Sequence, residues 1–295
     1  MSHFDYHQPD SLAEVIVLLS RYEREAALLA GGTALLIDIR HGELNPGHVI
    51  SLWGIQSLED VQVDGGSGFC LGSLVTIHRL AEALSGEPAL RGLIEAAQML
   101  GAQQVQNVAT VGGNICKASP GADMVPPLLC LDATLVLDGP DGQRKTPLDG
   151  FLIGPDQTAL RSAEVLTAIE IPAPPPRTGT AFLKVMRRHA VDCSIVAVSA
   201  RVTLAEDGQT VLTSHLGLGA VAPNPFRARG AEALLNGQKL EPELLRSAAV
   251  QARSEARPIS DVRASADYRS MLVETLVERA LAKAAERAVE GATIP

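Results

Sequence analysis

The sequence predicts an α+β protein, in which a two-part α/β unit precedes a smaller α+β unit with an antiparallel sheet and helices. Up to residue 171, short apolar runs alternate with helical patterns. Residues 172–179, P-A-P-P-P-R-T-G, then have the composition of a stiff linker. Beyond them, two long strand-like segments precede helical patterns. We therefore predict a first domain over residues 1–175, divided near residues 55–60, and a second over residues 176–295.

The elements of the first unit follow from periodicity and flanking residues. A helix is expected over residues 11–22, where Ser11 and Glu14 form a capping-box pattern. Short apolar runs predict strands at residues 26–30, 48–52, 69–74, 133–137 and 165–171. Helical spacing predicts helices at residues 33–40, 77–84, 90–100 and 123–131. Pro126 and Pro127 fit the first turn of the last helix.

The second unit begins with two strand-like segments, residues 194–204 and 211–219. The Asp207-Gly208 turn between them predicts an antiparallel pair. Helical patterns follow at residues 229–235, 242–256 and 266–288, the last after Ser265 as a possible cap.

Composition narrows the classes of function. The net charge is 25 − 34 = −9 and aromatic residues make up 3%, which argues against a nucleic-acid partner. No apolar stretch is long enough for a membrane span, and the polar N-terminus lacks a signal-peptide pattern. A cytoplasmic protein is expected.

Cysteines and histidines give no sign of a metal or a catalytic triad. Four cysteines without a C-x-x-C pair are interpreted as small buried hydrophobic residues, and no metal site is expected. They are Cys70, Cys116, Cys130 and Cys193. The seven histidines are interpreted as surface or structural residues, with His189 the strongest exception.

Two glycine pairs, Gly31-Gly32 and Gly112-Gly113, each predicted to follow an apolar strand, carry the functional signal. There is no G-x-G-x-x-G fingerprint, so a Rossmann site is not supported. Glycine accepts positive φ and lets backbone N–H groups approach a phosphate. Each pair could equally be a tight turn. Two of them together also fit a ligand that carries phosphates.

Longer motifs around the glycines resemble one family. The pattern F-x-Y-x-x-P-x-S-x-x-E starts at Phe4, and L-L-A-G-G-T-A-L-L spans residues 28–36. T-V-G-G-N-I-C-x-A-S-P-x-A-D-M-V-P-P-L-L spans residues 110–129, and F-L-K-V-M-R-R spans residues 182–188. The chain is similar over nearly its full length to the FAD-binding medium subunits of molybdenum hydroxylases, which include those of xanthine dehydrogenase, carbon monoxide dehydrogenase and N-heterocycle hydroxylases.

The resemblance implies a PCMH-type FAD domain and assigns cofactor-binding residues. The first loop would wrap the adenine-proximal pyrophosphate with Leu28, Leu29, Ala30, Gly31, Gly32, Thr33, Ala34 and Leu35. The second would hold the other phosphate and the ribityl side with Thr110, Val111, Gly112, Gly113 and Asn114. Asp123 would accept bonds from cofactor hydroxyls, Leu100 and Leu166 would line the cofactor, and Lys184 would lie near the flavin. Ile195 matches a ring-packing position approximately. Ala34 departs from the family, which often has a polar residue there.

The resemblance also implies a role. The chain would be the FAD-carrying electron-transfer subunit of a heterotrimer, with its C-terminal domain closing over the flavin. It would take electrons from a small [2Fe–2S] subunit and pass them to an external acceptor: NAD, oxygen, a quinone or a cytochrome. A large molybdopterin subunit would oxidise the substrate, in a dimer of heterotrimers. No residue of this chain is expected to be catalytic. The alternatives are a free-standing FAD oxidase or dehydrogenase and a flavin-free assembly subunit.

Overall fold

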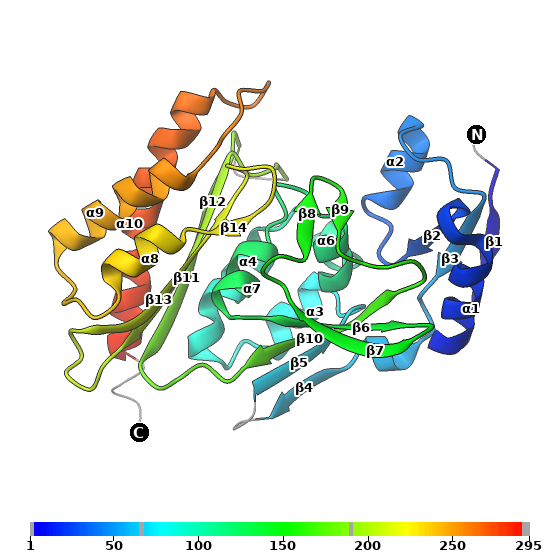
Figure 1. Cartoon of the computed structure of the whole chain (residues 1–295), viewed down its shortest axis with the longest axis horizontal. Helices are drawn as coiled ribbons and strands as arrows, with labels where there is room; N and C mark the ends of the chain where they lie inside the picture. The colour runs from blue at the N-terminus through cyan, green and yellow to red at the C-terminus, as the bar shows by residue number, and fades with distance from the viewer. Residues whose placement is uncertain (1–2, 65–67, 189–190, 291–295) are drawn as a thin grey trace.

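The computed structural model describes residues 3–64, 68–188 and 191–290. These residues form sheets of three, five and four strands and a two-stranded ribbon. The three larger sheets follow one another along the long axis of the molecule (Figure 1). We call the three parts the N-terminal unit (residues 3–58), the middle unit (59–172) and the C-terminal unit (178–290).

The N-terminal unit is a small parallel sheet with two helices. Its strands, in the order β1-β3-β2, are all parallel. Its elements are β1 (Asp5–His7), α1 (Leu12–Tyr22), β2 (Ala26–Leu29), α2 (Leu35–His41) and β3 (His48–Ser51). Ser11 caps α1 by accepting from the Glu14 amide, whereas the Glu14 carboxylate accepts from the amide of Asp10 rather than that of Ser11. Val15, Leu19 and Ile50 form its core.

The middle unit is an antiparallel sheet in the order β4-β5-β10-β6-β7, with helices on one face. Its strands are β4 (Val61–Asp64), β5 (Gly68–Gly72), β6 (Thr134–Gly139), β7 (Gly142–Pro147) and β10 (Val165–Pro172), beside the ribbon of β8 (Leu152–Gly154) and β9 (Gln157–Thr158). Its helices are α3 (Ile77–Ala83), α4 (Arg91–Met99), α5 (Gln103–Gln106), α6 (Val111–Cys116) and α7 (Val125–Cys130). Apolar side chains of both layers form one core.

The C-terminal unit is an antiparallel sheet in the order β11-β12-β13-β14. Its elements are β11 (Thr178–Val185), β12 (Val196–Leu204), β13 (Val211–Gly219), β14 (Phe226–Arg227), α8 (Arg229–Leu235), α9 (Pro242–Glu255) and α10 (Ala266–Glu290). Helix α10 packs on one side of the sheet, and α4 and α7 of the middle unit also contact its strands (Figure 1). Every residue of β12 is therefore buried.

Two local predictions were wrong. The predicted linker is shorter: Pro172 ends β10, where it faces Gly68, and a missing N–H costs little at a strand end. Thr178 and Gly179 already belong to β11, because the Thr178 hydroxyl bonds to that of Thr203 and Gly179 lets the backbone of α10 approach closely. The second glycine pair follows no strand. It lies in the first turn of α6.

Candidate functional site

A cavity of about 510 Å³ opens where the first glycine loop meets the second, between the N-terminal and middle units. Most of the residues predicted to bind the cofactor line it: Leu28, Ala30, Gly31, Gly32, Thr33, Ala34, Leu35, Leu100, Thr110, Gly113 and Asn114. Residues far apart in the sequence thus share one cavity, of a size common for small-molecule sites. The other predicted residues lie behind its walls or farther away: Leu29, Val111, Gly112, Asp123, Leu166 and Lys184.

The first loop presents unpaired backbone donors. Gly32 has a φ of +70°, and α2 begins after Ala34 without a side-chain cap. Among the described residues, the N–H groups of residues 31–34 have no hydrogen-bond acceptor. The Trp53 indole N–H donates to the Ala30 carbonyl at 2.7 Å and holds the loop from behind. An anion in the cavity would complete the bonding of these donors.

Gly31 sets the distance between the two loops. A Cβ atom at this position would lie 2.0 Å from the carbonyl oxygen of Val108 and 2.9 Å from the Cα atom of Ala109. Those residues immediately precede the second loop, so a side chain here would force the loops apart. Gly31 is needed first for backbone packing, and this packing keeps the unpaired donors next to the second loop.

The second loop differs from the prediction in what it offers a ligand. Thr110 caps α6, and the four amides that follow it all have protein acceptors. Val111, Gly112, Gly113 and Asn114 donate to the Val75 carbonyl, the Ser73 carbonyl, the Thr110 hydroxyl and the Thr110 carbonyl. The hydroxyl of Thr110 and the side-chain NH₂ group of Asn114 are therefore its available donors, since the Asn114 carbonyl oxygen accepts from Met124.

Asp123 and Lys184 form a buried ion pair behind the cavity. The Lys184 ammonium lies 2.7 Å from one carboxylate oxygen of Asp123, and the Ser194 hydroxyl donates to the other at 2.7 Å. Burial raises the pKa of Asp123, against the opposing effects of Lys184 and Ser194. Lys184 also contacts the Met99 carbonyl, next to cavity-lining Leu100. The pair joins the middle unit to β11 at this end of the cavity.

Charged residues that the sequence reasoning missed complete the cavity wall: Asp38, Glu43, Lys117 and Asp156. The Lys117 ammonium lies 2.9 Å from both the Asp38 and the Asp156 carboxylates. Lys117 stands at an unspecified position of the long second motif, and only its place inside that motif hinted at a role. Apolar Leu44, Val105 and Ala109 also line the cavity.

The arrangement fits a dinucleotide. Unpaired amides and hydroxyl and amide donors meet in one cavity, which is also lined by leucine and valine side chains. Backbone donors suit phosphate oxygens, and apolar walls suit an aromatic ring. The thiol of Cys116 lies on the wall, but burial raises its pKa to about 12, so it stays protonated. The residues present therefore fit a cofactor that carries phosphates and aromatic rings.

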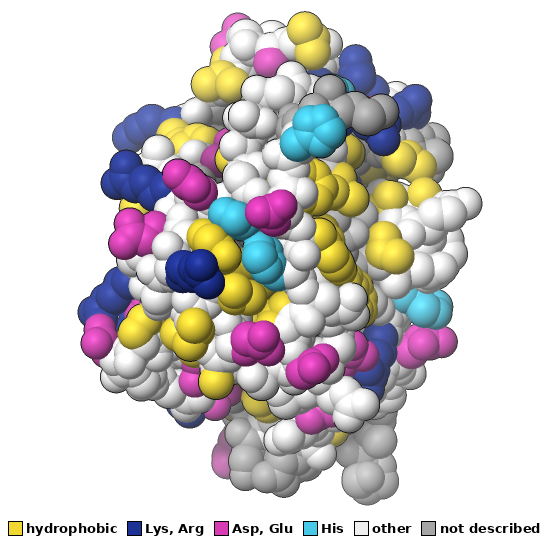
Figure 2. All heavy atoms as spheres, turned by 90° about the vertical axis from the view of Figure 1, so that its right-hand side faces the viewer, with side chains coloured by type: hydrophobic (Ala, Val, Ile, Leu, Met, Phe, Trp, Pro, Cys, Tyr) yellow, Lys and Arg dark blue, Asp and Glu magenta, His cyan; other side chains and the backbone are white. Residues whose placement is uncertain are grey.

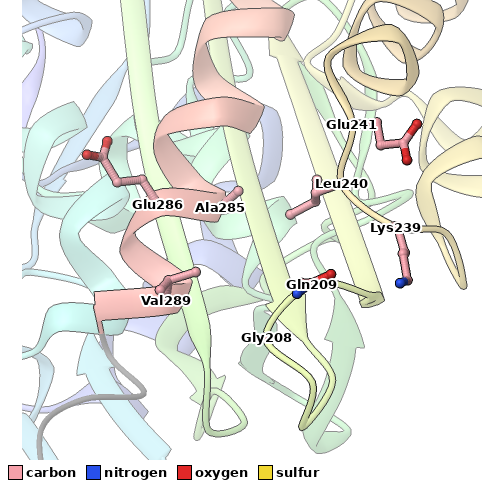
Figure 3. Close-up of a pocket in the computed structure, with 8 residues that line it drawn as sticks. All are labelled: Gly208, Gln209, Lys239, Leu240, Glu241, Ala285, Glu286 and Val289. Atoms are coloured by element: carbon pink, nitrogen blue, oxygen red, sulfur yellow. The ribbon is translucent and has the colours of Figure 1, made fainter.

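A second hollow, of about 350 Å³, lies in the C-terminal unit between the β12–β13 turn and α10 (Figure 3). Its lining lacks this combination and consists of Gly208, Gln209, Lys239, Leu240, Glu241, Ala285, Glu286 and Val289. On the N-terminal face, histidines lie near hydrophobic side chains (Figure 2). In the N-terminal unit, His7 contacts His48 at 3.1 Å and Tyr22 stacks on His48. His189 lies outside the described residues.

The remaining candidates have structural surroundings. Arg187 lies 3.6 Å from the Asp192 carboxylate. Ile195 is buried, and its carbonyl accepts from the buried Arg269. The four cysteines lie apart, in β5, α6, α7 and the segment before β12. Cys130 is buried as predicted, whereas Cys193 is exposed, so the interpretation of all four as buried residues was wrong for Cys193. In the part of the chain that the structure describes, no helix is long and apolar enough to cross a bilayer.

Comparison with known proteins shows the family to which the chain belongs. Residues 2–174 match the FAD binding domain in molybdopterin dehydrogenase, and residues 181–284 match the CO dehydrogenase flavoprotein C-terminal domain. The chain belongs to this family of flavoprotein subunits. It is 32% identical to the carbon monoxide dehydrogenase medium chain of Hydrogenophaga pseudoflava, over 94% of this chain and 96% of that one. It is 31% identical to the xanthine dehydrogenase FAD-binding subunit of Escherichia coli O157:H7, over 95% of each.

Solved structures give the same result. A carbon monoxide dehydrogenase structure from Hydrogenophaga pseudoflava superimposes with a TM-score of 0.93 at 33% identity, covering 97% of this chain and 98% of that one. Quinoline 2-oxidoreductase from Pseudomonas putida 86 gives a TM-score of 0.88 at 28% identity, with 97% and 98% coverage. The α+β fold expected from the sequence is confirmed.

Proposed function

We propose that this chain carries FAD and serves as the electron-transfer subunit of a heterotrimeric molybdenum hydroxylase. It takes electrons from a [2Fe–2S] subunit and passes them to an external acceptor. A large molybdopterin subunit oxidises the substrate. The family membership over both parts of the chain supports this role. The observation that carries it is the first loop, whose unpaired N–H groups line a cavity shared with Thr110 and Asn114.

The residues would divide the work of holding FAD. The N–H groups of residues 31–34 would bind pyrophosphate oxygens, and Ala34 helps because it puts no capping side chain in competition with the ligand. Thr110 and Asn114 would donate from the opposite wall. When bound, FAD supplies the redox chemistry, and the protein supplies position and electrostatics.

The buried pair at the inner end of the cavity has a separate proposed role. Asp123 and Lys184 would lie beside the flavin end, since Lys184 contacts the Met99 carbonyl and the next residue, Leu100, lines the cavity. Both oxygens of Asp123 already accept protein hydrogen bonds. We therefore propose that Asp123 orients Lys184 and that cofactor hydroxyls donate further hydrogen bonds to the Asp123 carboxylate. Leu166 would line the cofactor from the core of the middle unit.

The domain limits and the assembly belong to the same proposal. The FAD-binding domain would span residues 1–175, divided near residues 55–60, and residues 176–295 would form a C-terminal domain that closes over the flavin. The order of the three sheets and the limits of the two family matches support these boundaries. The complete enzyme would be a dimer of heterotrimers in the cytoplasm. Sedimentation of the native complex and cell fractionation test the two parts of that statement.

The test is purification of the full chain, alone and with its native partners. We expect flavin absorbance from the chain alone, with FAD released on denaturation. Substrate should reduce the flavin only when the [2Fe–2S] and molybdopterin subunits are present. Turnover by the isolated chain would favour a free-standing oxidase or dehydrogenase. A colourless chain that binds no added FAD would favour a flavin-free assembly subunit.

A further inference from the structure

Lys117 is the only cation among the described residues that line the cavity. It immediately follows α6, and its ammonium bonds Asp38 in α2 and Asp156 in the turn between β8 and β9, each at 2.9 Å. Burial works against the charge of Lys117, but the bonds to both carboxylates outweigh it and raise its pKa. The Asp156 backbone N–H also donates to the carbonyl of Ala118, which fixes the turn beside Lys117.

The Lys117–Asp38 pair connects two parts of the molecule. Asp38 belongs to the N-terminal unit, whereas Lys117 and Asp156 belong to the middle unit. Within the described ranges, this pair is the only side-chain hydrogen bond or ion pair that joins residues 3–58 to the rest of the chain. The other contacts between these units are apolar, around Leu74 and Val165, or involve the backbone, at Gly31 and in the hydrogen bond from the Leu74 amide to the Leu58 carbonyl. Lys117–Asp38 is therefore the one polar side-chain link at the cavity wall among the described residues.

The charges around Lys117 indicate what it does. Asp38, Glu43 and Asp156 line the same cavity, so carboxylates outnumber the single ammonium. Two of these carboxylates lie within bonding distance of the Lys117 ammonium. The charge of Lys117 is therefore paired within the protein and does not need a ligand to balance it. Asp156 lies in the same unit as Lys117, and its bond holds the Lys117 ammonium next to Asp38 of α2. Asp38 is the partner whose bond breaks when the units separate.

We propose that the Lys117–Asp38 ion pair is a latch between the N-terminal and middle units that sets how fast the cofactor leaves the cavity. This inference rests on the proposed FAD function. A ligand held between two units leaves only when they part, so a bond that joins the units slows its release. Because Lys117 and Asp38 are 35% and 21% exposed, salt reaches the pair and weakens it.

The experiment measures FAD release from the full chain. The protein is loaded with FAD and diluted into excess ADP, which blocks rebinding, and free flavin fluorescence is followed over time. Lys117→Met and Asp38→Asn should each speed release roughly fivefold, the upper range for a partly exposed ion pair. Wild-type release should accelerate with salt, and Lys117→Met release should not. Thermal melting checks that each variant is folded.

Glu43→Gln is the matched control. Like Asp38→Asn, it removes one negative charge from the cavity wall, but it leaves the Lys117–Asp38 bond intact. If the Lys117–Asp38 pair acts as a latch, Glu43→Gln does not speed the release of FAD. If Asp38→Asn slows release while Lys117→Met speeds it, Lys117 pairs with the phosphates instead and the latch is wrong. Equal rates in all variants also overturn it. A wild-type chain that binds no FAD overturns the proposed function itself.

Discussion

Gly31→Ala tests whether the approach of the two loops determines cofactor binding. The new Cβ would lie 2.0 Å from the Val108 carbonyl oxygen, where ordinary contact begins at 3.4 Å, so the first loop must move by more than an ångström. Hydrogen bonds tolerate only a few tenths of an ångström. Each bond from an amide to a charged acceptor contributes about 1.5–3 kcal/mol. Loss of two such bonds would raise the Kd for FAD by at least about a hundredfold.

The assay is a fluorescence titration of FAD into the apo form of each variant. Urea unfolding is measured beside it, because overpacking at Gly31 should also lower the free energy of unfolding by about 1–3 kcal/mol. Gly86→Ala is the control, since a Cβ there meets no atom within 4 Å and its φ is not positive. An unchanged Kd in Gly31→Ala, with the predicted loss of stability, would refute the assignment of the first loop to the cofactor.

Three further predictions concern single residues. Gly113→Val adds bulk on the exposed cavity wall, so the purified chain should lose flavin absorbance; full occupancy would contradict this. Its melting temperature should fall only slightly, because the new Cβ would lie 2.9 Å from the hydroxyl of Thr110 and displace that cap. Asp123→Ala leaves the buried Lys184 ammonium unpaired and should cost about 3–5 kcal/mol in urea unfolding. A much smaller cost would contradict the stabilising role of this ion pair. Burial and two neighbouring arginines lower the pKa of His215 below 6.5, so the unfolded chain binds a proton more readily. Stability should hold above about pH 6.5 and fall below it, and His215→Asn should flatten that fall.

The strands that sequence reasoning missed share a position in the fold. β1, β4 and β7 lie at sheet edges, where no apolar alternation is required. β7, G-Q-R-K-T-P, has no apolar side chain except its terminal proline. The central strands β5, β6 and β10 were predicted because both their neighbours and the helices bury them. Sequence reasoning therefore found the central strands and missed most edge strands. The edge strand β2 is the exception, because its sequence A-A-L-L is an apolar run.

Helix α6 could not be predicted for a different reason. Its two glycines and its asparagine have low helix propensity. The helix is stabilised by the Thr110 cap and by hydrogen bonds to the carbonyls of Ser73 and Val75. Those partners come from another part of the middle unit. The local sequence contained the cap, but the stabilising bonds depend on tertiary structure.

The candidate site, too, was predictable from the sequence only in part. The glycine pairs were visible because their composition and motifs are local. The contact of Lys117 with Asp38 joins residues 79 positions apart, and nothing in either neighbourhood specifies the other. The protein acceptors of the second loop's amides were equally hidden, so its predicted contribution changed from backbone to side-chain donors.

The close backbone contacts between the middle and C-terminal units have a consequence for folding. A Cβ at Gly217 would lie 2.4 Å from the Pro126 carbonyl oxygen, and one at Gly92 would lie 3.0 Å from the backbone of Ala181. These two units are also joined by the ion pairs of Lys184 with Asp123, Arg201 with Asp132 and Arg287 with Glu95. The N-terminal unit is joined to the middle unit by the Lys117–Asp38 pair alone among the described side-chain ion pairs, so we expect the middle and C-terminal units to unfold as one cooperative block. Amide protons of β2 should exchange with solvent before those of β10 and β12. Under mild denaturant, the half of the cavity that contains the first loop would then melt first, leaving a folded remainder.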